Sequence, residues 1–219
     1  MKITWLGLLD SDDATASTRA QDHLARLARH VILASRHAWS IELISCGRSP
    51  GCHTLSAGVE RVVLPVAGSP RTVWDRVSWA LPAAIGPADL VHLHDGFSRS
   101  CEVALLIAKQ GRKPVCMTEW GLEGYWLSSE LALRELADVV VCHDVAVANS
   151  TATSKPVHLV PLGIDVRQFG VPASWPQNHC LDLQGEDVAL PPDDEYAAAA
   201  TCLHGVYQDL AGSLRRVAA

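Results

Sequence analysis

Acidic residues follow several short apolar runs of this sequence. Asp10-Ser11-Asp12-Asp13 follows the first run, His94-Asp95-Gly96 ends the run that begins LVHL, and Glu119-Trp120-Gly121 follows PVCMT. Carboxylate oxygens accept hydrogen bonds, so they suit hydrogen-bond donors of a ligand. If the runs are parallel strands, their carboxyl ends lie at one edge of a sheet, where open α/β sheets bind ligands. We therefore take Ser11, Asp12, His94, Asp95, Gly96, Glu119, Trp120 and Gly121 as candidate site residues.

Asp95 and Glu119 also have a simpler interpretation, as caps of the helices that follow them. A ligand site predicts that Asp95→Asn, Glu119→Gln and Gly121→Val each weaken sugar binding and leave the melting temperature nearly unchanged. Capping predicts instead a stability loss of about 0.5–2 kcal/mol and unchanged binding.

His92 and His94 lie two residues apart, so a strand places both imidazoles on one face, as in some metal sites. The surrounding run is apolar and typical of a strand covered on both faces, which favours buried, hydrogen-bonded histidines. We expect no metal. The tryptophans are either a sugar-stacking surface or core residues, and we expect one of four to face a ligand: Trp74, Trp79, Trp120 and Trp126.

Short apolar runs alternate with segments of helical periodicity, which predicts a parallel sheet built by right-handed crossovers. We expect a single doubly wound, Rossmann-like α/β domain of six or seven strands over residues 1–169, with strand order 3-2-1-4-5-6. Residues 170–219 are predicted to be an irregular tail and a C-terminal helix that packs back on the domain. The expected strands cover residues 2–9, 40–46, 60–67, 90–95, 114–118, 139–143 and 157–160, and the expected helices 17–37, 71–84, 98–110, 128–137 and 195–217.

Composition restricts the function. The 219 residues are 48% apolar and 19% charged with a net charge of −6, which describes a globular domain and argues against nucleic-acid binding. No apolar run reaches the ~20 residues of a membrane span, and the amino terminus is too short in apolar residues for a signal peptide, so we expect a soluble, cytoplasmic protein. The cysteine count of seven is odd, and Cys46, Cys116 and Cys142 lie in strand-like runs, which favours reduced, structural thiols.

Neither G-x-G-x-x-G nor a Walker-type loop follows the first strand, which disfavours a dinucleotide-binding domain or a P-loop NTPase. Four other segments occur in a familiar order. They are ADLVHLHD (residues 88–95), KPVCMTEWG (113–121), LADVVVCH (136–143) and LVPLGIDVRQF (159–169). This series resembles the amino-terminal half of family 4 glycosyltransferases, which are retaining enzymes with the GT-B fold.

The resemblance implies an acceptor-binding first domain, with the nucleotide sugar bound by a second domain and no metal or other cofactor. Asp95 and Glu119 would orient the acceptor hydroxyl, Ser11 and Asp12 would line the opposite lip, and Gly163 would lie where the family crosses into its second domain. This chain departs from the family in three ways. The loop after the first strand, DSDDATAST, lacks paired glycines, Trp120 stands where a histidine is usual, and the second domain is missing.

The departures leave several hypotheses. The chain is the acceptor-binding half of a nucleotide-sugar-dependent hexosyltransferase that works with a separate donor-binding partner, or it is a non-catalytic module that binds a sugar, a nucleotide or a protein. A third hypothesis is an enzyme of another class that is built on the same sheet. A domain that has lost its partner should also expose an apolar patch that includes Trp120, Tyr125 and Trp126, leading to self-association or a hetero-partner.

Overall fold

A computed structural model describes residues 1–7, 19–71, 73–94, 98–119, 133–151, 153–162 and 191–217. These residues form one eight-stranded sheet in the order β3-β4-β2-β1-β5-β6-β7-β8. The strands are β1 Lys2–Leu6, β2 Ser40–Gly47, β3 Gly51–Ser56, β4 Val59–Pro65, β5 Leu90–Leu93, β6 Val115–Glu119, β7 Val139–Cys142 and β8 Val157–Leu159. The helices are α1 Arg19–Ala34, α2 Leu81–Ile85, α3 Arg99–Gln110, α5 Val145–Ser150 and α6 Asp193–Val217, with 3₁₀ turns η1 Val73–Asp75 and η2 Leu133–Leu136.

The predicted strand order is confirmed, but the sheet has one strand more than predicted and is mixed. Every neighbouring pair is parallel except β3 with β4. The sequence GCHTLS of β3 lacks apolar alternation because this edge strand is mostly exposed. The two-residue connection to β4 contains Gly58 at φ +80°, a conformation that glycine adopts without strain.

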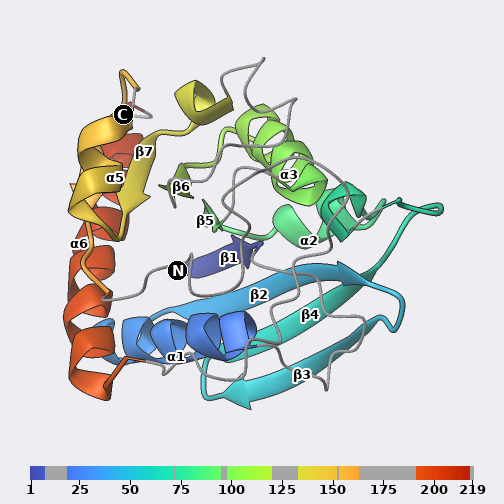
Figure 1. Ribbon diagram of the computed structural model, residues 1–219, viewed down its shortest axis with the longest axis horizontal. Helices are drawn as coiled ribbons and strands as arrows, with labels where there is room; N and C mark the ends of the chain where they lie inside the picture. Colours follow the sequence, from blue (N-terminus) through green and yellow to red (C-terminus); the bar gives the residue numbers. More distant parts are fainter. Residues whose placement is uncertain are drawn as a thin grey trace.

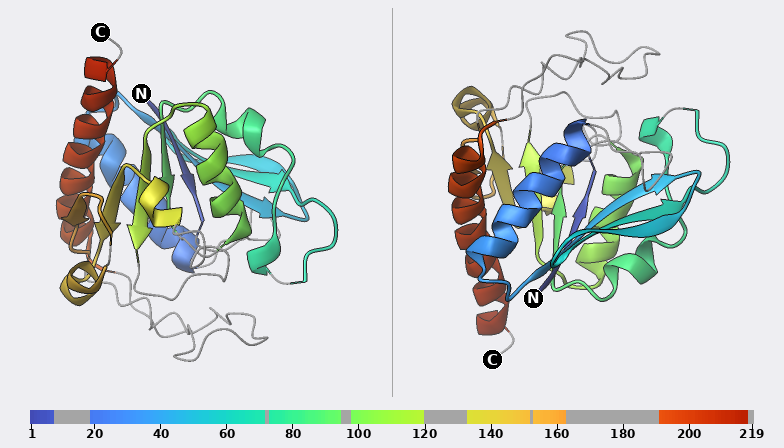
Figure 2. Two further views of the ribbon diagram at one scale, coloured as in Figure 1. Left: turned by 90° about the horizontal axis from the view of Figure 1, so that it is seen from above. Right: turned by 90° about the horizontal axis from the view of Figure 1, so that it is seen from below.

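Helices cover both faces of the sheet (Figure 1, Figure 2). On one face α1 and α6 pack over Ile3, Trp5 and Ile41, and on the other α2 and α3 pack over Leu6 and Ile44. Five residues predicted to be nearly fully buried are each at most 1% exposed: Val91, Leu93, Val115, Val140 and Cys142. The apolar strands are therefore central strands covered on both sides, as the sequence indicated.

The C-terminal helix packs back on the domain, as predicted. Its buried positions follow a helical period and face α1 and the sheet: Tyr196, Ala199, Ala200, Leu203, Val206 and Tyr207. Trp39, which precedes β2, stacks on His204 of α6 with ring centroids 4.4 Å apart. The long helix is thus part of the core.

One helix prediction was wrong, and one helix was not predicted. Residues 71–84 were expected to form one helix, but the described part contains only η1 and the five-residue α2. Pro82 lies in the first turn of α2, where its missing N–H costs nothing, so it begins a helix that it was expected to break. The sequence did not predict α5, which has no buried residues. The side chain of Asp144 caps its amino-terminal end.

No helix in the described ranges combines the length and the apolar character that crossing a membrane requires.

Candidate functional site

The carboxyl ends of β5 and β6 lie side by side, as the sequence predicted. Leu93 of β5 is in register with Met117 of β6, so the segments that follow these strands leave the sheet at the same edge. Of the candidate site residues, Glu119 and His94 fall within the described part of the chain. The other candidate site residues lie outside the described residues: Ser11, Asp12, Asp95, Gly96, Trp120, Gly121 and Gly163. Tyr125 and Trp126 of the expected apolar patch also lie outside them.

Glu119 is the last residue of β6 and lies opposite Cys142 of β7. Its side chain is 13% exposed, and its Oε2 lies 3.6 Å from Nη1 of Arg134 in η2. This guanidinium is a neighbour that the sequence analysis did not anticipate. The carboxylate therefore stands at the carboxyl edge with a cation beside it, and with some access to solvent.

His94 follows β5 directly, and its side chain is fully buried. Its ring centroid lies 4.5 Å from that of Trp5 and 4.0 Å from that of His92. Burial, together with the neighbouring imidazoles of His92, His143 and His23, lowers the pKa of His94 well below its usual value. The imidazole of His94 is therefore neutral. It lies in the core of the domain and not at its surface.

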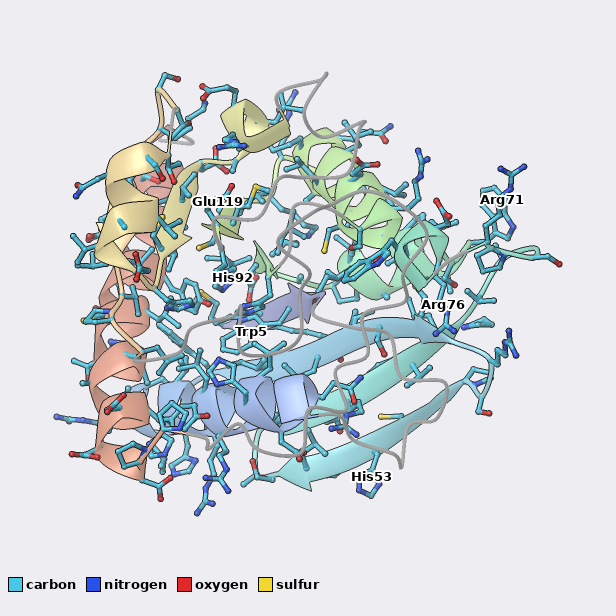
Figure 3. The ribbon with its side chains drawn as sticks, in the orientation of Figure 1. Trp5, His53, Arg71, Arg76, His92 and Glu119 are labelled. Carbon is cyan, nitrogen blue, oxygen red and sulfur yellow. The ribbon has the colours of Figure 1, made fainter. Side chains whose placement is uncertain are left out.

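Three further histidines lie buried around His94, and two tyrosines of α6 reach them. Trp5 and His92 lie close together near the centre of the sheet, with Glu119 nearer its edge (Figure 3). Hydrogen bonds join Nδ1 of His92 to the Tyr207 hydroxyl and Nε2 of His92 to Oγ1 of Thr118, the second at 2.7 Å. Nδ1 of His23 in α1 lies 2.9 Å from the Tyr196 hydroxyl. We call His23, His92, His94 and His143 the histidine cluster.

The histidine cluster is held neutral by its surroundings. Burial lowers the pKa of His23 to about 3, and the neighbouring His143 adds to that effect. Burial lowers the pKa of His143 to about 4, although His143 Nδ1 donates to the carbonyl oxygen of Val160 at 2.6 Å. The pKa of His92 also falls well below its usual value, through burial first and then through His143.

These properties of the histidine cluster favour a structural role over catalysis or metal binding. A neutral imidazole donates at one nitrogen and accepts at the other, so it can satisfy a buried tyrosine on one side and a strand residue on the other. Within the described part of the chain, no three His, Cys, Asp or Glu side chains form a group that could hold a metal ion. The prediction of a buried, hydrogen-bonded His92 is confirmed.

The two tyrosine partners were missed by the sequence analysis, although a signal existed. Tyr196 and Tyr207 lie on the apolar face of α6, where a buried hydroxyl requires a hydrogen-bond partner. The expectation that one of the four tryptophans faces a ligand stays a prediction. Trp74 is buried, and Trp120 and Trp126 lie outside the described residues, whereas Trp79 is 87% exposed.

No protein-family model matches the chain, and no curated protein matches it. Among solved structures, it is similar to a chain of the sucrose-phosphate synthase of Thermosynechococcus elongatus. The TM-score is 0.51 at 12% sequence identity, and the match covers 96% of this chain and 99% of that chain. At this identity the likeness shows the fold alone, which is glycosyltransferase-like. Membership of family 4 stays a prediction.

Proposed function

We propose that this protein is the acceptor-binding half of a retaining, nucleotide-sugar-dependent hexosyltransferase and that it works with a separate donor-binding partner. The observation that carries the proposal is the likeness to the sucrose-phosphate synthase chain, which extends over nearly the whole length of both chains. The family 4 resemblance of residues 88–169 supplies the retaining chemistry, the absence of a metal and the division of labour between two domains.

The position of α6 supports this origin. The likeness covers 96% of this chain, so it is not limited to the sheet. In this chain α6 docks on α1 and the sheet. A boundary near residue 169, followed by a tail whose helix returns to the domain, fits an enzyme half whose donor domain is encoded elsewhere.

In this proposal the carboxyl edge of β5 and β6 holds the acceptor. Glu119 and Asp95 accept hydrogen bonds from the hydroxyl that receives the sugar, while Ser11 and Asp12 line the opposite lip. Gly96, Trp120, Gly121 and Gly163 border the same edge. The ring of His94, which follows β5, is fully buried. The donor-binding partner supplies the groups that stabilise the departing diphosphate.

A thermal-shift screen of nucleotide sugars and glycans tests the proposal. A ligand at about 100 times its dissociation constant should stabilise the chain by ~2.7 kcal/mol. Glu119→Gln should reduce the shift produced by a glycan. Glu60→Gln, at an exposed position of β4, is the matched control and should leave the shift unchanged. Binding of glycans that Glu119→Gln does not alter would contradict the role of this edge.

The second candidate is a non-catalytic module that binds a sugar, a nucleotide or a protein. It is favoured by the loop DSDDATAST, which lacks the glycines that approach donor phosphates, and by Trp120 in place of the usual histidine. Transfer or hydrolysis of a nucleotide sugar by the chain, alone or with a donor-binding protein encoded beside it, would rule this candidate out.

A further inference from the structure

The sheet ends in two edge strands, β3 and β8, which differ in how open they are to another strand. β8 has only three residues, and Lys155 and Pro156 directly precede it. A short length, a lysine and a proline are among the features by which natural sheets prevent an edge from pairing with another chain. β3 has six residues and contains no proline and no Lys, Arg, Asp or Glu. The edge at β3 therefore lacks the protection that the edge at β8 has.

β3 is paired on one side alone. It forms an antiparallel ladder with β4, and within the described ranges no strand lies beyond it (Figure 1). Gly51, Cys52, His53 and Thr54 are exposed and form consecutive pairs with β4, and the register shifts only after Thr54. A strand with one partner carries backbone N–H and C=O groups along its free side. Four regular, exposed residues of β3 are therefore available to bond a further strand.

The need to close this edge favours a second copy of the chain as its partner. A strand from a different protein would pair with β3 and become the new open edge. A second copy instead brings its own open edge, so pairing β3 with β3 closes both at once and leaves the two protected β8 edges at the ends. Charge agrees with this choice. Each chain has a net charge of −6, but two β3 strands meet without placing like formal charges opposite one another.

Two-fold symmetry restricts the register of such a pair. An axis perpendicular to the sheet keeps each side chain on its own face, and side chains alternate between the faces along a strand. A residue can therefore pair only with itself or with a residue an even number of positions away. An axis at His53, near the middle of β3, places Cys52 opposite Thr54 of the second copy and joins the two eight-stranded sheets into one.

We propose that two copies of this chain associate through β3, each strand pairing antiparallel with the other about a two-fold axis near His53. One pair of short strands is a small contact beside the ~1,600 Å² that a typical stable interface buries, so the dimer is weak and reversible. The proposal is independent of the proposed function. β6, which ends at Glu119, lies five strands from β3 in the sheet, about 24 Å at the usual strand spacing, so the dimer leaves the predicted acceptor edge open.

Analytical ultracentrifugation of the full chain over a wide range of concentration tests the proposal. The wild type should show a monomer–dimer equilibrium. Thr54→Lys should weaken dimerisation about tenfold or more, because the dimer brings the two lysines close together across the axis. In the monomer the new lysine lies opposite Glu60 of β4, a favourable pair that should preserve the fold. Thr201→Lys adds the same charge at an exposed position of α6 and is the matched control, expected to dimerise as the wild type does.

A cross-link locates the contact. In a chain with Cys180→Ser and Cys202→Ser, Cys52 is the one exposed thiol within the described part of the chain. The other cysteines that the structure describes are buried: Cys46, Cys101, Cys116 and Cys142. With the axis at His53 the two Cys52 residues are diagonal neighbours ~7–8 Å apart, so a short bismaleimide should join them into a covalent dimer. Thr54→Lys should reduce the yield of this dimer, and Cys52→Ser should abolish it.

The proposal is overturned if the chain is monomeric at every concentration. It is also overturned if the chain dimerises but Thr54→Lys leaves the equilibrium unchanged or Cys52 forms no cross-link, since another surface then holds the copies together. A monomeric chain that pairs β3 with a strand of a different protein would likewise exclude the second copy. If Thr54→Lys lowers the melting temperature, His53→Lys on the other face of β3 takes its place, and the Cys52 cross-link tests the contact without it.

Discussion

The histidine cluster should make the folded domain unstable in weak acid. His23, His92, His94 and His143 are nearly or fully buried, and all four have a pKa below the usual value for histidine. In the unfolded chain the same imidazoles are hydrated and regain a pKa near 6.5. Below that pH the unfolded chain binds more protons than the folded one, so acid favours unfolding.

The size of the effect follows from the folded-state pKa values of His23 and His143. Each histidine lowers the free energy of unfolding by ~1.4 kcal/mol per pH unit below its unfolded pKa, until the pH reaches its folded pKa. At about pH 5, His23 and His143, with folded pKa values of about 3 and about 4, each cost ~2 kcal/mol. Together these two histidines cost ~4 kcal/mol at that pH, a large part of the stability of a typical domain, and the lowered pKa values of His92 and His94 act in the same direction.

Urea denaturation followed by tryptophan fluorescence, between about pH 7.5 and pH 5, measures this loss. Carboxylates contribute little in that range because their usual pKa values lie near 4. His94→Gln should lower the number of protons taken up on unfolding by about one, which makes the free energy of unfolding less dependent on pH. This holds even if the substitution lowers stability at neutral pH. Thr54→Val, at an exposed position of β3 without a titratable group, should leave the pH dependence as it is in the wild type. A free energy of unfolding that does not change over this range would refute the burial of the cluster.

Three further predictions concern stability. Tyr207→Phe removes the partner of His92 Nδ1 and should lower the free energy of unfolding by about 1–3 kcal/mol in urea denaturation, whereas an unchanged midpoint would mean that the hydrogen bond is absent. Val140→Asp buries an unpaired carboxylate in a fully buried strand and should prevent folding, so a soluble variant that melts cooperatively would contradict the position of β7. Asp144→Ala removes the acceptor for the backbone N–H groups of Ala146 and Val147 and should cost about 0.5–2 kcal/mol by the same assay, with Asp144→Ser restoring most of it.

The parallel core was predictable because its strands bury both faces. Runs such as LVHL and VVVC contain almost no polar residues, which is typical of central parallel strands, and the strand order followed from the alternation of strands and helices. The edge strand β3 was not predictable in this way, since its exposed residues carry no periodic signal. Residues 71–84 were predicted as a helix from their Trp and Val content, although the backbone takes only two short turns there.

The site was less predictable than the fold, because its contacts join residues far apart in the sequence. His92 and Tyr207 are separated by 115 residues, and His23 and Tyr196 by 173. A pattern in one segment cannot show which helix will lie over it. The Arg134 neighbour of Glu119 was missed for a related reason, since the sequence predicted a helix over residues 128–137 but not that it would lie beside the end of β6. What the sequence could show was the edge of the sheet at which ligands should be sought.

The docking of α6 restricts where a donor-binding partner could attach. Tyr196 and Tyr207 are fully buried and hydrogen bonded to histidines of α1 and β5, so α6 cannot leave without exposing polar groups of the core. The face of the sheet that α1 and α6 cover is therefore closed to a partner, and α2 and α3 close the opposite face. Glu119 lies at the carboxyl end of β6 and its side chain is 13% exposed, so this edge of the sheet is accessible there. In the proposed function, a donor-binding partner meets the acceptor at this edge, because both faces of the sheet are already occupied by the chain's own helices.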